Sequence, residues 1–149
     1  MADSDMIKLY SGRILALAAE MPLTAPLATP EATARKRSPL CGSTVTVQLS
    51  TKAGRISEYS QEVKACALGQ AAASVVGSAI IGRSRAEVEQ ARDQLVAMLK
   101  TGGPVPEAPF DGLGVLEPAK DYKNRHASIL LSLDATLEAM NAAEKSACA

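Results

Sequence analysis

The sequence predicts an α+β fold, in which an N-terminal helix comes first, a three-stranded antiparallel sheet follows, and further helices pack on one face of that sheet. Three observations predict it. Apolar and polar residues alternate from Thr44 to Leu49, the connections between the expected strands are short, and helical periodicity dominates after Cys66. The length of 149 residues suits one domain, so we expect a single domain over 1–149 with a flexible tail at about 142–149.

The first helix is predicted over about 4–19, where Ile7, Ile14 and Leu15 contribute to an apolar face. Three prolines follow within 22–30, so we expect an irregular connection over 21–39, with the basic cluster 35–37 as a solvated loop. Strands are then predicted at about 44–49, 55–59 and 61–65, and the turn between the first two contains Gly54.

The remaining elements are predicted as helices. The run 66–76 is apolar on all sides, which is typical of a buried helix, and Gly82 marks its end. Ser84 and Glu87 form a capping box that opens the next helix, and 102–104 (Gly-Gly-Pro) closes it. After a loop to about Gly112, the last helix is expected from about Asn124.

Charge and hydropathy exclude several classes of protein. Sixteen basic and sixteen acidic residues give a formal net charge of zero, which argues against a nucleic-acid binder that depends on bulk phosphate attraction. The first residues do not resemble a signal peptide, and the apolar run 71–81 is too short to span a bilayer. We therefore expect a cytoplasmic protein without membrane association.

Three cysteines are the main candidates for chemistry. In a reducing compartment they are more consistent with metal binding or thiol chemistry than with disulfides. Cys66 is expected in the first turn of the buried helix, where free N–H groups and the helix dipole stabilise a thiolate. Gly42, beside Cys41, would let a ligand approach the backbone closely. Cys41 and Cys66 could equally be small buried hydrophobic residues, whereas Cys148 is expected as an exposed thiol in the tail.

His126 is the only histidine and is expected in the first turn of the last helix. The helix dipole disfavours an imidazolium there, so a neutral ring that coordinates metal is conceivable, although a lone histidine is more often not a ligand. Asp134, farther along that helix, is expected as a surface charge.

These motifs resemble the U-type iron–sulfur cluster assembly scaffold family, which includes IscU, SufU and the N-terminal domain of NifU. The resemblance rests on "SPLCGSTVTVQL", "VKACALGQAAAS", "IIGRSRAEVEQARDQL" and "DYKNRHASILLSLDATLEAM", together with the early "LYSGRILALA". It covers nearly the whole chain. Arg125 matches the arginine of the SufU form.

The resemblance implies a site with two departures. The family uses three cysteines and an aspartate. Cys41 and Cys66 are present here, but the aspartate position is Ser43 and the third cysteine position is Ser128, while the family histidine would fall at Ala127, one residue after His126. Such clusters normally take four protein ligands, and two chains could supply four thiolates in a homodimer, Cys41 and Cys66 from each, while the sequence leaves the oligomeric state open.

The function that the resemblance implies is a scaffold or carrier, not an enzyme. It would accept sulfur from a cysteine desulfurase, with Cys66 as persulfide acceptor, and pass a transient 2Fe–2S cluster to client iron–sulfur proteins. His126 would be an auxiliary ligand. Two alternatives stay open: an adaptor or regulator that binds the desulfurase without a cluster, and a small zinc protein that uses Cys41, Cys66 and His126.

Overall fold

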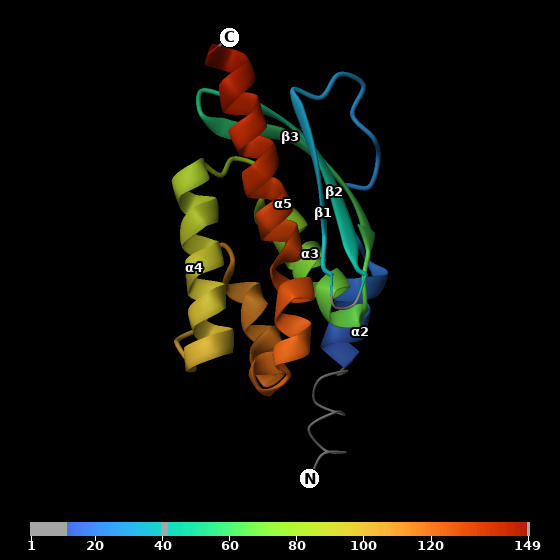
Figure 1. The fold of residues 1–149 in the computed structure, drawn as a ribbon, viewed down its shortest axis with the longest axis vertical. Coiled ribbons are helices and arrows are strands. Elements are labelled where there is room, and N and C mark those ends of the chain that lie inside the picture. Colours follow the sequence, from blue (N-terminus) through green and yellow to red (C-terminus); the bar gives the residue numbers. More distant parts are fainter. Residues whose placement is uncertain (1–11, 40–41, 149) are drawn as a thin grey trace.

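The computed structural model describes residues 12–39 and 42–148, with side chains to residue 145. It confirms the α+β class with a helix before an antiparallel sheet (Figure 1). The elements in chain order are α2 (Gly12–Ala19), β1 (Ala32–Arg37), β2 (Thr44–Lys52), β3 (Arg55–Lys64), α3 (Ala67–Ala79), α4 (Arg85–Thr101), the 3₁₀ helix η1 (Asp111–Asp121) and α5 (Lys123–Cys148). The predicted residues 4–11 of the first helix lie outside the described residues.

The sheet has the order β1-β2-β3, with both pairs antiparallel. Val45, Val47 and Leu49 of β2 are buried, as the alternating pattern predicts, and the long helix α5 packs across β1 and β2 on that face (Figure 1). This packing joins the sheet to the helices in one hydrophobic cluster of mostly aliphatic side chains. The sheet therefore serves as the wall against which α5 is placed.

The identity of the three strands was predicted wrongly. The expected strands 55–59 and 61–65 form one continuous strand, β3, and the remaining strand is β1, inside the segment 21–39 that was expected to be irregular. β1 buries only the small residues Ala32 and Ala34, so its alternation carries a weak hydropathy signal. The basic cluster 35–37 therefore lies on an edge strand, where Lys36 pairs with Glu138 of α5 at 3.8 Å.

The apparent break within β3 has a structural reason. Tyr59 and Gln61 are buried on the core face of the sheet, which they share with their β2 partners Leu49 and Val47, while Ser60 is buried on the opposite face beside Gln48, whose side chain accepts the Leu27 N–H. The Gln61 backbone N–H donates to the Leu23 carbonyl at 2.9 Å, and the Gln61 side-chain amide donates to the Pro22 and Ala73 carbonyls. Polar residues buried in this way hide a strand from a periodicity argument.

Helix ends agree with the sequence more closely than strands do. The capping box of Ser84 and Glu87 is formed, and α4 ends at Gly102 in a left-handed conformation with φ of 69°. The loop expected up to about Gly112 is followed by η1, which was not predicted and which buries Leu113 and Leu116. The expected flexible tail differs too: α5 continues to Cys148, Ala143 is buried, and Glu144 pairs with Arg85 at 2.6 Å.

A buried polar pair ties α5 to the sheet. The Thr136 hydroxyl donates to the Ser132 carbonyl at 2.7 Å, so the Tyr59 hydroxyl donates to Thr136 Oγ1 at 2.8 Å. Burial raises the pKa of Tyr59 above its ordinary value, and the hydrogen bond with Thr136 only partly offsets this. Among the described residues, no helix has the length and hydropathy that a membrane span requires.

Candidate functional site

Three elements that are distant in sequence converge on one polar cluster. Ser43 immediately precedes β2, Cys66 immediately precedes α3, and Ser128 lies in the second turn of α5. Cys66 Sγ lies 3.7 Å from Ser128 Oγ, and Ser128 Oγ donates to Ser43 Oγ at 3.2 Å. Ser43 and Ser128 are buried, whereas Cys66 is half-buried. The half-buried thiol of Cys66 therefore lies beside the buried hydroxyl of Ser128, which bonds to the hydroxyl of Ser43.

The conformation of Cys66 follows from its place at the start of α3. It is the N-cap residue, with an extended backbone (φ −67°, ψ 170°), and its carbonyl accepts the N–H of Gln70 at 2.9 Å. The Cys66 side chain does not cap the first turn, and no acidic residue stands there. The thiol is therefore beside uncapped N–H groups of a buried helix, as the sequence predicts.

Gly69 sets the distance between α3 and α5 at this site. A Cβ added there would lie 2.5 Å from Ser128 Oγ and 2.9 Å from the Cβ of Ala65. The missing side chain lets Ser128 reach Cys66. Sequence reasoning passed over Gly69, although a glycine inside an otherwise apolar helix costs about 1 kcal/mol relative to alanine and therefore calls for a packing reason.

A tight loop carries the third part of the cluster. The Ser38 N–H donates to the Ser43 carbonyl, and the Gly42 N–H donates to the Ser38 carbonyl, both at 2.8 Å. Gly42 has φ of 72°, and no atom lies within 4 Å of the position that its Cβ would take. Backbone conformation alone therefore requires glycine here. Cys41 lies outside the described residues, so its position beside Cys66 stays a prediction.

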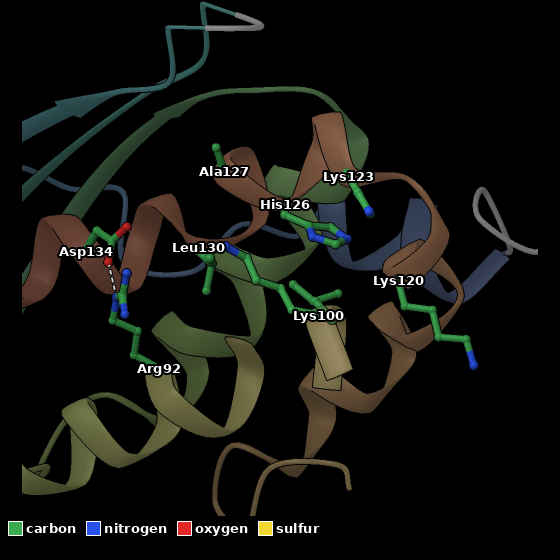
Figure 2. Close-up of a pocket in the computed structure, with 9 residues that line it drawn as sticks. Arg92, Lys100, Lys120, Lys123, His126, Ala127, Leu130 and Asp134 are labelled. Carbon is green, nitrogen blue, oxygen red and sulfur yellow. Dashed lines mark hydrogen bonds and ion pairs between the residues drawn. The ribbon is translucent and has the colours of Figure 1, made fainter. Parts of the chain in front are cut away.

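His126 is placed elsewhere. Its Nε2 lies 3.0 Å from the Ala119 carbonyl, and its ring lines a pocket between α4, η1 and α5 (Figure 2). Residues two apart on a helix do not share a face, so His126 and Ser128 point in different directions. The described structure does not bring His126 to Cys66, and within residues 12–39 and 42–148 no group of three histidine, cysteine or acidic residues is arranged to hold a metal.

Two further residues of α5 can be placed. Arg125, a predicted site neighbour, is half-buried in the first turn of α5. Asp134, expected as a surface charge, has a side chain that is 28% exposed and forms an ion pair with Arg92 of α4. This partner is available because α4 packs against α5.

Comparison with known proteins gives a clear relative. The N-terminal domain of a nitrogen-fixing NifU-like protein from Brucella abortus is 44% identical, with a TM-score of 0.91, over 95% of this chain and 98% of that one. This chain belongs to the NifU-like family. It is thus a member of the U-type scaffold proteins, in agreement with the motifs around Cys41, Cys66 and Ser128.

More distant structures share only the fold with this NifU-like chain. A SufU protein from Fervidobacterium islandicum AW-1, described as a putative iron–sulfur cluster assembly scaffold for the SUF system, is 21% identical over 90% of this chain and 98% of that one, with a TM-score of 0.76. A hypothetical protein is 18% identical over 95% of this chain and 99% of that one, with a TM-score of 0.74. No protein-family model and no curated protein matches the chain.

Proposed function

We propose that this NifU-like protein is an iron–sulfur cluster assembly scaffold or carrier, which accepts sulfur and iron and passes clusters to client proteins through Cys41 and Cys66. One observation carries the proposal. The positions that the family resemblance assigns to the aspartate, the second cysteine and the third cysteine are Ser43, Cys66 and Ser128. Cys66 Sγ lies 3.7 Å from Ser128 Oγ, which lies 3.2 Å from Ser43 Oγ, although the three residues belong to sequence-distant elements. The frame of a ligand site is therefore retained, although two of its ligands are hydroxyls.

The donor set of one chain does not fit a cluster with four protein ligands. Serine hydroxyls are neutral, and those of Ser43 and Ser128 already bond to each other. Iron–sulfur clusters take thiolates, with histidine as an occasional substitute. One chain offers Cys41 and Cys66, so a cluster carried as cargo would need the same two thiols from a second copy. His126 is not a candidate fourth ligand in this arrangement, because it faces the pocket beside α4.

Cys66 is our choice of sulfur acceptor. Its half-buried thiol is within reach of a partner, and the Ser128 hydroxyl, 3.7 Å away, can donate to a thiolate there by turning its proton away from Ser43. In the transfer, the Cys66 thiolate attacks the terminal sulfur of a cysteine desulfurase persulfide. A new S–S bond forms on Cys66, the bond within the donor persulfide breaks, and the desulfurase cysteine leaves as a thiolate. No external oxidant or reductant is needed, because one S–S bond replaces another.

The test is anaerobic reconstitution with ferrous iron and sulfide, read by visible absorption and by metal content. We expect broad thiolate-to-iron absorption that is lost in Cys41→Ser and in Cys66→Ser but kept in the matched control Cys148→Ser. Colour that survives both substitutions would contradict the proposal. Stoichiometric zinc without colour would favour the zinc alternative.

The hydroxyls at positions 43 and 128 also favour a second candidate, a cytoplasmic adaptor that binds a cysteine desulfurase without carrying a cluster. The two candidates separate in one experiment. Persulfide transfer from desulfurase, followed with labelled sulfur, should mark Cys66 in the carrier. An adaptor would bind the desulfurase with the same affinity after Cys66→Ser and would acquire neither label nor iron.

A further inference from the structure

A pocket lined by cations lies between α4, η1 and α5, on a different face of α5 from Ser128 (Figure 2). Its volume is about 560 Å³, within the range of roughly 300–1,000 Å³ typical of small-molecule sites. Leu99 and Leu130 supply apolar surface. The polar lining comprises Arg92, Lys100, Lys120, Lys123, His126 and Asp134.

The charges in this pocket are unbalanced. Arg92 and Asp134 neutralise each other in an ion pair, but the three lysines form no ion pair with any residue that the structure describes. This concentration of positive charge occurs in a chain whose formal net charge is zero. Gathering like charges in a hollow focuses a positive potential there, which favours an anionic ligand.

The start of α5 adds to the same field. Its first turn contains no acidic residue, and its first residue is Lys123. A cation at a helix N-terminus opposes the helix dipole, which itself favours a bound anion. Lys123 therefore destabilises the isolated helix α5 through the helix dipole, but its charge attracts an anion to the same place.

His126 gives the pocket a fixed polar wall. The ring is buried, and because a carbonyl oxygen only accepts, Nε2 carries the proton that is donated to Ala119. Nδ1 has no hydrogen-bond partner among the described residues, so it is the ring atom left for a ligand. Figure 2 shows the imidazole between Lys100 and Lys123, with the Lys120 side chain extending outward at the rim.

We propose that this pocket binds a small polyanion, such as a phosphorylated or polycarboxylate metabolite, with Lys100 and Lys123 as its main charge partners. Lysine acts as a point charge toward either group, while the charge of Arg92 is offset by Asp134, which pairs with its Nε. Leu99 and Leu130 would accept the apolar part of the ligand. The inference does not depend on cluster chemistry at Cys66.

The experiment uses the protein without metal, titrated with pyrophosphate and separately with citrate at constant ionic strength. His126 is the only histidine, so its ring resonances can be followed by NMR without ambiguity. We expect saturable shifts of these resonances with at least one probe, and the same dissociation constant by calorimetry. Lys100→Gln/Lys123→Gln should weaken binding by about tenfold per lysine, since each removes a charged hydrogen bond.

The matched control is Lys52→Gln/Lys64→Gln, which changes the net charge equally at exposed strand positions. It should bind as the wild type does, and Cys66→Ser should too. Pyrophosphate alone binding would identify phosphate as the recognised group, and citrate alone would identify carboxylate. No saturable shift at about 10 mM of either probe, or equal weakening in the control, would overturn the proposal. Circular dichroism verifies that both double variants are folded.

Discussion

Gly69→Ala tests the close approach of α3 and α5 that builds the thiol site. The new Cβ would meet Ser128 Oγ at 2.5 Å, the Ala65 Cβ at 2.9 Å and the Ser128 carbonyl oxygen at 3.2 Å. The serine hydroxyl can rotate away, but a Cβ and a backbone oxygen cannot. Overpacking of this kind costs about 1–3 kcal/mol, while alanine gains about 1 kcal/mol in helix propensity. Because two of the three contacts cannot yield, we take the upper part of that range, about 2–3 kcal/mol, which leaves a net loss of about 1–2 kcal/mol.

The assay is thermal and urea unfolding of the metal-free protein. The expected loss corresponds to a fall in Tm of about 2–8 °C for a chain of this length. Gly12→Ala in α2 is the matched control, because nothing lies within 4 Å of its added Cβ, and it should not destabilise. In an Ala65→Gly background the cost of Gly69→Ala should shrink, since a contact that cannot rotate away is gone. A Gly69→Ala protein as stable as the wild type, or strict additivity with Ala65→Gly, would refute the packing argument.

Three further predictions follow from the site and the core. Ser128→Cys combined with Ser43→Asp should raise metal affinity in anaerobic titrations, because it restores the charged donors of the family; unchanged affinity would mean that the three positions do not act as one site. Tyr59→Phe should cost about 1 kcal/mol at neutral pH through the lost Thr136 hydrogen bond. Because burial raises the pKa of Tyr59, the unfolded state loses its proton first and stability falls as pH rises above about 10; urea unfolding at pH 8 and 10.5 should show a smaller fall in Tyr59→Phe. Gly42→Val should destabilise by about 1–2 kcal/mol, because of its left-handed backbone, and Gly42→Asn by less; equal melting temperatures would contradict this.

Helices could be read from the sequence because their signals are local. The capping box at Ser84 and the left-handed Gly102 fix both ends of α4 in the predicted places. β1 could not be read in this way, because its buried residues are two alanines and its partner residues in β2 are distant in sequence. β3 was divided wrongly since the buried Gln61 donates its side-chain N–H groups to the carbonyls of Pro22 and Ala73, contacts that no periodicity encodes.

The same difference between local and long-range features decides how much of the candidate site could be predicted. Cys66 at a helix start is a local feature, and the resemblance assigns Ser43 and Ser128 to the same site. Local sequence cannot reveal that Ser128 faces Cys66 while His126, two residues earlier, faces a cationic pocket, because this depends on how α5 is rotated against α3 and α4. The role of Gly69 likewise depends on long-range packing, because Gly69 of α3 contacts Ser128 of α5, 59 positions farther along the chain.

Native mass spectrometry of the anaerobically reconstituted protein tests directly whether two copies share one cluster. We expect a dimer that carries two iron and two sulfide ions, held by Cys41 and Cys66 of both copies, and loss of this species in Cys66→Ser. A cluster on the monomer would contradict the shared site. A chain that gains no iron under these conditions, while Cys148→Ser and the wild type are equally folded, would contradict the assignment of a scaffold function.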